Sequence, residues 1–334
     1  MRKRRRLAPT LAMAKVGARA ILKPTHPVLV HMIPMRRCNL ACDYCNEYDD
    51  HSPPVPTDQM LARVDRAAKL GASWITFSGG EPLLHPDLDT LIARIAHHGM
   101  MPELLTNAFL LSPNRIRRLN EAGLLRMQIS IDNVQPDEIS KKSLKTIGRK
   151  MEHLAAHARF DVNINSVVGA GIPNQQDAVV IARRARELGF SSTVGVIHDG
   201  DGQLRALGPN EREAYDELRG LDVWPLSKFV AFKDNLVAGK PNEWRCRAGA
   251  RYLYVCEDGL VHRCSQHRGY PGIPFLEYTA EHMAAEYRAK KRCAPMCTIS
   301  CVHAVSVFDN WRHPQKPDTL ELTPAGRRRL QVVS

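Results

Sequence analysis

Three cysteines near the start of the chain have the spacing of a metal-binding loop. Cys38, Cys42 and Cys45 form a C-x3-C-x2-C pattern directly after an apolar run, and this close spacing lets three thiolates converge on one inorganic centre. Thiolate ligands suit iron–sulfur clusters and zinc alike. A structural zinc site usually takes four protein ligands, and no fourth cysteine lies nearby in the sequence. The pattern therefore favours a [4Fe-4S] cluster with one iron open to an exogenous ligand over a zinc loop or unrelated thiols.

A second group of polar residues follows other apolar runs. Ser78, Gly79, Gly80, Glu81 and Pro82 form a turn in which glycines let the backbone approach a ligand closely and the acidic group can pair with an ammonium. Such a turn also serves as an ordinary strand–helix connection. Further polar residues occupy strand positions that should face a core, where they cost free energy unless they find partners: Thr106, Asn107, Ser130, Asp132, Asn163 and Asn165. We expect these residues either to bind a ligand or to cap strand ends.

Short apolar runs that alternate with helical patterns must position these residues. The runs predict strands over 28–34, 74–78, 102–106, 127–132, 162–168 and 193–198, and the patterns predict helices over 57–71, 87–99, 112–122, 137–158, 174–189 and 209–219. Strict alternation implies parallel pairing with right-handed crossovers. The predicted fold is therefore α/β, a partial (β/α)6 TIM-type barrel. In such barrels the chemistry lies where strands run out into the following loops, and the polar groups above lie there.

The remaining six cysteines lie between residues 246 and 301. Nine cysteines, an odd number in two clusters, fit metal ligation in a reducing cytoplasm better than disulfides. Cys246 and Cys264 flank Gly259, and Cys293, Cys297 and Cys301 follow at intervals of four residues. Cys256 does not fit this ligand pattern. It is expected to be a buried small apolar residue, or else a catalytic thiol that donates a hydrogen atom or ligates iron.

The first cysteine pattern, with its position after a strand, resembles that of the radical S-adenosylmethionine (SAM) superfamily. The resemblance implies that the open iron binds the amino and carboxylate groups of SAM, and that one electron from the cluster cleaves SAM to a 5′-deoxyadenosyl radical. Tyr44 sits where the family often places an aromatic beside the nucleoside. The Gly79-Gly80-Glu81-Pro82 turn resembles the contact to the methionine part of SAM. Equivalent strand ends in the family contact the SAM ribose and carboxylate, which assigns this role to Thr106, Asn107, Ser130, Asp132 and Asn165.

The later cysteines resemble the start of the SPASM/twitch extension, in which a cysteine, a glycine and a second cysteine follow at similar intervals. A full SPASM domain has more cysteines than the six found here, and the spacing from Cys293 to Cys301 departs from its pattern. The resemblance therefore implies one auxiliary [4Fe-4S] cluster, held by Cys246, Cys264 and two of Cys293, Cys297 and Cys301. Zinc is the alternative occupant, because four thiolates suit it equally.

The basic charge is concentrated at the N-terminus. Residues 1–23 carry eight basic side chains and no acidic one, which leaves about +4 of the net charge of +12 for the rest of the chain. Apolar residues from Leu7 to Leu22 recur at helical spacing, so this basic amphipathic segment is expected to contact a membrane surface, to pack against the barrel, or to bind an acidic partner or nucleic acid. It is loosely similar to the helix before the cysteine loop in radical SAM enzymes that adenosylate hopanoid lipids.

Together these patterns predict four regions: a basic segment over 1–26, the barrel over 27–220, an auxiliary-cluster domain over 221–310 and a tail over 311–334. The expected function is modification of an unactivated C–H position of a lipid, peptide or natural product, with the auxiliary cluster transferring electrons or binding substrate. A low-potential donor of the flavodoxin or ferredoxin type is the expected partner, and no nucleic acid. The expected location is cytoplasmic, with peripheral membrane contact as an alternative. The rival is a non-catalytic zinc or nucleic-acid-binding protein.

Overall fold

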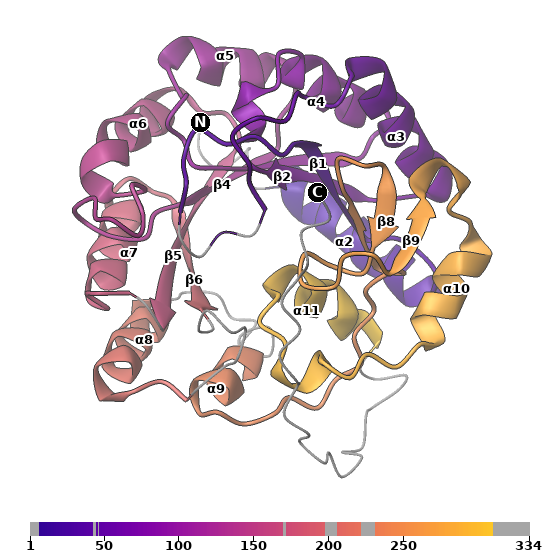
Figure 1. Ribbon diagram of the computed structural model, residues 1–334. Helices are drawn as coiled ribbons and strands as arrows, with labels where there is room; N and C mark the ends of the chain where they lie inside the picture. Colours follow the sequence, from indigo (N-terminus) through magenta and orange to yellow (C-terminus); the bar gives the residue numbers. More distant parts are fainter. Residues whose placement is uncertain are drawn as a thin grey trace.

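One curved sheet of nine strands organises the chain, in the order β6-β5-β4-β3-β2-β1-β7-β8-β9. The computed structural model describes residues 7–42, 45, 47–169, 172–197, 206–221 and 231–309. Six parallel strands run from one edge to the centre of the sheet, and helices cover their outer face (Figure 1). The expected α/β fold with a partial (β/α)6 TIM-type barrel is confirmed.

The parallel strands are β1 (Leu29–Met35), β2 (Trp74–Gly79), β3 (Met101–Thr106), β4 (Arg126–Ser130), β5 (Asp161–Gly169) and β6 (Ser191–Ile197). The helices that follow them are α3 (Thr57–Leu70), α4 (Leu88–His97), α5 (Pro113–Glu121), α6 (Leu144–His157), α7 (Asp177–Glu187) and α8 (Pro209–Leu221). A 3-10 turn, η1 (Pro82–Leu84), precedes α4.

Alternate strand residues divide the sheet into two faces, as the two-residue period of a strand requires. Val30, Met32, Ile75 and Phe77 are buried in the apolar core shared with the outer helices. The residues between them, such as His31, therefore point to the inner face of the barrel. Polar side chains predominate there, and the candidate functional groups come from that face and from the loops after the strands.

Helix ends follow their local sequence signals in most places. Ser112 caps α5 by accepting a hydrogen bond from the Arg115 N–H at 3.1 Å, and Gly71 ends α3 at φ 82°. Thr57 does not cap α3: its hydroxyl donates to Asp87 instead.

The expected start of α6 at residue 137 is wrong. This helix begins at Leu144, because Ser143 is its N-cap and accepts from the Thr146 N–H at 3.2 Å. Residues 133–143 are therefore a loop after β4 rather than a helical turn.

The cysteine-rich region continues the barrel sheet. Strand β7 (Tyr252–Val255) pairs in parallel with β1, from Leu29 opposite Tyr252 to Met32 opposite Val255. Antiparallel β8 (Leu260–His262) and β9 (Pro271–Pro274) follow it. The other elements of this region are α9 (Ala231–Val237), η3 (Phe275–Glu277), α10 (Ala280–Arg288), η4 (Ala294–Met296), α11 (Ser300–Ser306) and η5 (Val307–Asp309). The expected tail over 311–334 lies outside the described residues.

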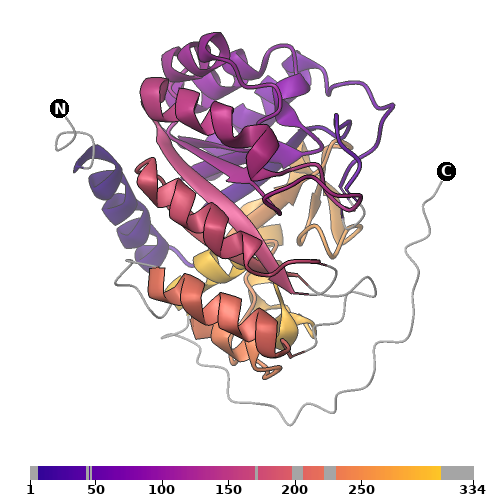
Figure 2. The ribbon, with the colours of Figure 1, turned by 90° about the vertical axis from the view of Figure 1, so that its left-hand side faces the viewer.

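The N-terminal helix α2 (Leu7–Leu22) lies beside the C-terminal region (Figure 2). Val16 and Ala20 are buried with Val302 and Val305 of α11, so for these two residues the structure shows the expected packing against the body of the protein. Its last residues, Ile21 and Leu22, are exposed. None of the helices in the described ranges combines the length and apolar character needed to cross a bilayer.

Candidate functional site

The cysteine loop begins three residues after β1 and is tied back to itself. Asp49 connects the two sides of the loop, because its carbonyl accepts from the Cys38 N–H at 2.9 Å and its own N–H donates to the Arg36 carbonyl at 3.1 Å. The Cys45 N–H donates to the Cys42 carbonyl at 2.9 Å. Backbone hydrogen bonds therefore close the loop that carries the three cysteines. Tyr44 lies outside the described residues.

The three thiols are close enough for the charge of one to change the pKa of another. Burial raises the pKa of the Cys38 thiol to about 11, and negative charge on Cys45 or Cys42 would raise it further. A bound metal centre would stabilise these thiols as thiolates, because its positive charge offsets theirs. The donor set fits a cluster that offers three irons to three thiolates.

Gly79 and Gly80 hold this loop at the carboxyl end of β2. A Cβ at Gly80 would lie 2.1 Å from the Arg36 carbonyl oxygen and 2.3 Å from that of Arg37. The Gly80 N–H donates to the Met35 carbonyl at 3.1 Å. We expected these glycines to allow close approach of a ligand; the structure shows that they allow close approach of the cysteine-bearing backbone.

Glu81 joins β2 to β3 rather than standing free. Its carboxylate accepts from the Thr106 hydroxyl at 2.7 Å, the Asn107 N–H at 2.8 Å and the Leu83 N–H at 2.9 Å. Burial raises its pKa to about 7, while these donors act in the opposite direction. A carboxylate has about four lone-pair directions, so about one remains for an ammonium group. Pro82 begins the 3-10 turn η1 that follows.

Asn107 reaches from β3 to the cysteine loop. Its amide nitrogen lies 2.8 Å from Asn39 Oδ1 and 3.7 Å from Cys38 Sγ. The end of β3 therefore contacts the first cysteine directly.

The polar residues of β4 and β5 divide into two sets. Asn163 and Asn165 both bond the Thr193 hydroxyl, at 2.8 and 3.0 Å, and Ser130 is paired with Asn165 across the ladder. They form a polar strip on the inner face. Asp132 belongs elsewhere: its Oδ2 accepts from Ser140 Oγ at 2.7 Å and pairs with Lys142 Nζ at 3.0 Å.

His31 was not predicted from the sequence to be part of the site. On the inner face, its Nε2 contacts the Ser78 hydroxyl and its Nδ1 lies 3.2 Å from the Tyr252 hydroxyl. Burial lowers the pKa of this imidazole to about 4. The pairing of β1 with β7 was the missing signal, since it brings Tyr252 beside His31.

Four of the C-terminal cysteines share one environment. Cys246, Cys264 and Cys293 line a cavity of about 280 Å³ together with the basic residues Arg263 and Lys291. Burial raises the pKa of Cys297 well above its usual value, and negative charge on those three cysteines raises it further. Four sulfur donors beside cations suit an anionic iron–sulfur cluster, and they suit zinc as well.

Cys301 stands apart from these four. Burial raises its pKa to about 11, and the next contributions come from Glu103 and Glu47 rather than from other cysteines. Glu103 lies on β3 and Glu47 follows the first cysteine loop. Cys301 therefore faces the interior of the barrel.

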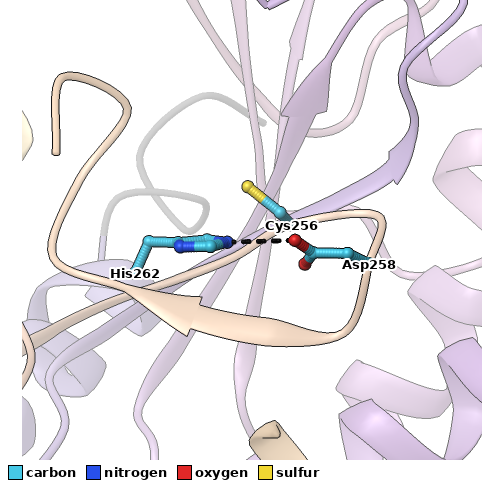
Figure 3. A group of neighbouring side chains, drawn as sticks. All are labelled: Cys256, Asp258 and His262. Carbon is cyan, nitrogen blue, oxygen red and sulfur yellow. Dashed lines mark ion pairs between the residues drawn. The ribbon is translucent and has the colours of Figure 1, made fainter. Parts of the chain in front are cut away.

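Cys256 lies in a third environment, with Asp258 and His262, whose ligand atoms are all within 4.8 Å of one another (Figure 3). The Gly269 N–H donates to His262 Nδ1 at 2.8 Å, so Nε2 carries the imidazole proton and faces Asp258 Oδ2 at 3.4 Å. The Arg268 guanidinium donates to Cys256 Sγ at 3.1 Å. Because the imidazole has no lone pair left for a metal and the sulfur already has a cationic partner, we interpret this group as a hydrogen-bonding network rather than a metal site.

Comparison with known proteins agrees with this geometry. The model of the radical SAM superfamily matches residues 32–204, which is more than half of the chain, and the chain therefore belongs to the radical SAM superfamily. It is an enzyme of this superfamily, whose members use a [4Fe-4S] cluster and SAM.

The relatives are named for different activities. The chain is 31% identical to GTP 3′,8-cyclase of Aquifex aeolicus over 49% of this chain and 57% of that protein. It is 34% identical to PqqA peptide cyclase of Granulibacter bethesdensis over 31% of this chain and 29% of that protein. The alignments thus span less than two thirds of either relative. Among solved structures, SuiB of Streptococcus suis bound to the precursor peptide SuiA superposes with a TM-score of 0.58 at 13% identity, covering 81% of this chain and 67% of SuiB.

Proposed function

We propose that this radical SAM enzyme modifies an unactivated C–H position of a peptide and carries an auxiliary [4Fe-4S] cluster. The observation that carries the proposal is the closed loop of Cys38, Cys42 and Cys45 at the carboxyl end of β1, braced by Gly80 from β2 and Asn107 from β3. The cysteines that influence the pKa values of Cys38 and Cys45 are members of this loop, and a set of three thiols suits a cluster with an open iron.

The residues around the loop bind and orient the cofactor. Cys38, Cys42 and Cys45 would hold the cluster, and the remaining lone-pair direction of Glu81 would accept from the SAM ammonium. When bound, the cluster and SAM supply one-electron chemistry that can break an unactivated C–H bond. Polar groups at the carboxyl ends of the strands would contact the SAM ribose and carboxylate. These groups belong to Thr106, Ser130 and Asn165.

The auxiliary cluster would be held by Cys246, Cys264, Cys293 and Cys297, because these four share one basic environment. Arg263 and Lys291 offset the negative charge of such a cluster. It would exchange electrons with the reacting substrate or hold that substrate. A donor of the flavodoxin or ferredoxin type would reduce the cluster at Cys38.

Two relatives favour a peptide over a lipid or another natural product. PqqA peptide cyclase is 34% identical in the aligned region, and SuiB, whose solved complex contains a precursor peptide, shares the fold over 81% of this chain. The N-terminal helix does not favour a lipid substrate, because Val16 and Ala20 pack against the body of the protein.

Anaerobic reconstitution with iron and sulfide tests the chemistry. We expect roughly eight iron atoms per chain, four for each cluster, and 5′-deoxyadenosine after addition of SAM and dithionite. The triple variant C38A/C42A/C45A should keep roughly four irons and produce none. Zinc bound in place of iron, with no 5′-deoxyadenosine, would overturn the proposal in favour of a zinc protein.

Fractionated cell extract tests the substrate class. The reconstituted enzyme is supplied with a peptide fraction, the same fraction after exhaustive protease digestion, and a solvent extract of lipids. We expect the undigested peptide fraction to increase 5′-deoxyadenosine formation and digestion to abolish the increase. An increase with the lipid extract, or one that survives digestion, would contradict a peptide substrate while leaving the radical SAM assignment intact.

A further inference from the structure

The cavity lined by Cys246, Cys264 and Cys293 reaches the surface beside a run of basic residues. Cys293 is exposed, whereas the other two cysteines are buried. The five residues before it, 288–292, include four basic side chains and no acidic one. A cluster held in this cavity would therefore have one ligand at the surface, next to a concentration of positive charge.

Lys291 and Arg263 belong to the inner wall of this cavity. Glu286 pairs with Lys291 Nζ at 3.1 Å, and it accepts from Arg263 Nε and Nη2 at 2.8 and 3.0 Å. The Lys291 side chain is only 3% exposed, so it is not accessible to another protein. One carboxylate faces two cations here, and the remaining positive charge suits an anionic cluster.

The neighbours of Lys291 in the chain differ from it in exposure. Lys290 and Arg292 line the same cavity, and both are exposed. His267, from the segment after β8, is a further exposed residue of the lining, and none of the described residues that line the cavity is acidic. Tyr270 adds an aromatic group that is 64% exposed, with its ring centre 5.9 Å from the Arg263 guanidinium. The basic surface consists of Lys290, Arg292, His267 and Tyr270.

We infer that the basic surface is the docking site of an acidic electron-donor protein of the flavodoxin type, which reduces the auxiliary cluster there. The inference rests on the proposed auxiliary cluster and adds the place where its partner binds. Opposite charges speed the encounter of two proteins and orient them. Electron-transfer complexes have small interfaces, so a compact charged surface around an exposed ligand suffices. One electron passes at each encounter, so the donor is oxidised and the cluster is reduced by one electron.

A competing basic surface lies beside the first cysteine loop. Lys141 and Lys145 are exposed, and Lys141 adjoins Ser140, whose Oγ is 3.7 Å from Cys42 Sγ. Cys42 is buried, however, and the other two cysteines of that loop are only partly exposed. The exposed ligand at Cys293 therefore favours docking at the auxiliary site.

Charge reversal in pairs separates the two surfaces. The double variant Lys290→Glu/Arg292→Glu alters the basic surface, and Lys141→Glu/Lys145→Glu alters the competing one. Arg117→Glu/Arg159→Glu, at exposed positions on α5 and after α6, is the control with the same change in net charge. We expect the first variant alone to weaken the binding of flavodoxin, by about tenfold at low ionic strength. The difference should shrink as salt is added, because salt screens exposed charges.

The measurement is the dissociation constant of oxidised flavodoxin for the reconstituted full-length protein, by anaerobic calorimetry at low and high salt. Roughly eight irons per chain and electron paramagnetic resonance show that each variant is loaded. The signal that changes when SAM is added reports the cluster with the open iron and separates it from the auxiliary cluster. The rate of 5′-deoxyadenosine formation with reduced flavodoxin is then divided by the rate with dithionite in the same preparation. This ratio should also fall about tenfold in the first variant, because dithionite needs no docking surface.

Four results would overturn the inference: wild-type affinity in the Lys290/Arg292 variant, an equal loss in the Arg117/Arg159 control, a loss in the Lys141/Lys145 variant instead, or no binding of flavodoxin to the wild type. If the Lys290/Arg292 variant keeps its affinity for flavodoxin but no longer responds to the peptide fraction, the surface binds the substrate instead. A wild-type protein that forms no 5′-deoxyadenosine with dithionite would count against the proposed function itself.

Discussion

Arg251 and Asp309 form a two-point ion pair that is buried beside the start of β7. The distances are 2.8 Å from Nε to Oδ2 and 2.8 Å from Nη2 to Oδ1. The same guanidinium donates to the carbonyls of Ala20 and Lys23, at 2.7 and 2.8 Å. It therefore joins the end of α2, the start of β7 and the last described turn, three segments that are far apart in the sequence.

Arg251→Met should destabilise the protein by about 3 kcal/mol, because the buried Asp309 carboxylate loses both short bonds and keeps only the longer pair with Arg247 at 3.5 Å. The carbonyl oxygens of Ala20 and Lys23 would also lose the hydrogen bonds from the Arg251 guanidinium. Urea unfolding of the reconstituted protein measures the change. Lys240→Met, at an exposed position, is the control and should change the free energy of unfolding by less than about 0.5 kcal/mol. A similar loss in both variants would contradict a special role for the pair.

Gly80→Ala should prevent assembly of the first cluster. The new Cβ would meet two backbone carbonyl oxygens of the cysteine loop, at 2.1 and 2.3 Å, so the loop itself must move. We expect iron content to fall from roughly eight to roughly four per chain, measured together with loss of the SAM-responsive signal.

A second glycine is the control for that substitution. Gly148 lies within α6, and a Cβ there meets no atom within 4 Å. Gly148→Ala should keep full iron content and stabilise the helix by about 0.5–1 kcal/mol. Full iron content in Gly80→Ala would show that the loop does not depend on this close approach.

Substitutions at the C-terminal cysteines should divide them into two groups. Cys297→Ala removes a member of the basic four-cysteine site and should lower iron content from roughly eight to roughly four. Cys301→Ala and Cys256→Ala should retain roughly eight, because these thiols lie in other environments. Iron analysis and Mössbauer spectroscopy distinguish the outcomes. Loss of the auxiliary signal in Cys301→Ala but not in Cys297→Ala would reverse the assignment.

Acid should weaken the fold partly through His31. Burial lowers its pKa from 6.5 to about 4, so between these values the unfolded chain binds more protons than the folded protein. The stabilisation from the neutral imidazole is complete above pH 6.5 and is lost as the pH falls toward 4, at up to about 1.4 kcal/mol per pH unit. Protonation would also force one of its two hydrogen-bond partners to reorient.

His31→Gln should therefore reduce the slope of unfolding free energy against pH between about pH 5 and 6.5. His26 and His303 keep part of the slope, since burial lowers their pKa values to about 4 as well. Urea unfolding across this range gives the slopes, and His157→Gln at an exposed position is the control. Equal slopes for wild type and His31→Gln would refute the argument.

The barrel was largely readable from the sequence because its signals are local. Each predicted parallel strand lies within two residues of an observed one, since apolar runs and glycine stops record the alternation directly. The start of α6 was placed wrongly because the cap at Ser143 overrides a helical pattern upstream.

Contacts between distant segments were not readable in the same way. The parallel pairing of β7 with β1 joins residues more than 200 positions apart, and no local pattern encodes it. That pairing also places Tyr252 against His31. His31 was not predicted as a site residue because this contact joins two distant parts of the sequence. Asp132 was expected to contact SAM; its pairing with Ser140 and Lys142 depends on the path of a loop that was predicted as helix.

The β1–β7 ladder has a consequence for how this protein can be divided. A chain cut before Tyr252 would leave β1 as an edge strand with unpaired backbone donors and acceptors. Exposed edge strands of this kind pair with other chains and promote aggregation. Chimeras that graft this barrel onto a foreign C-terminal half must therefore bring a replacement strand of matching register, or they will precipitate before any cofactor is loaded.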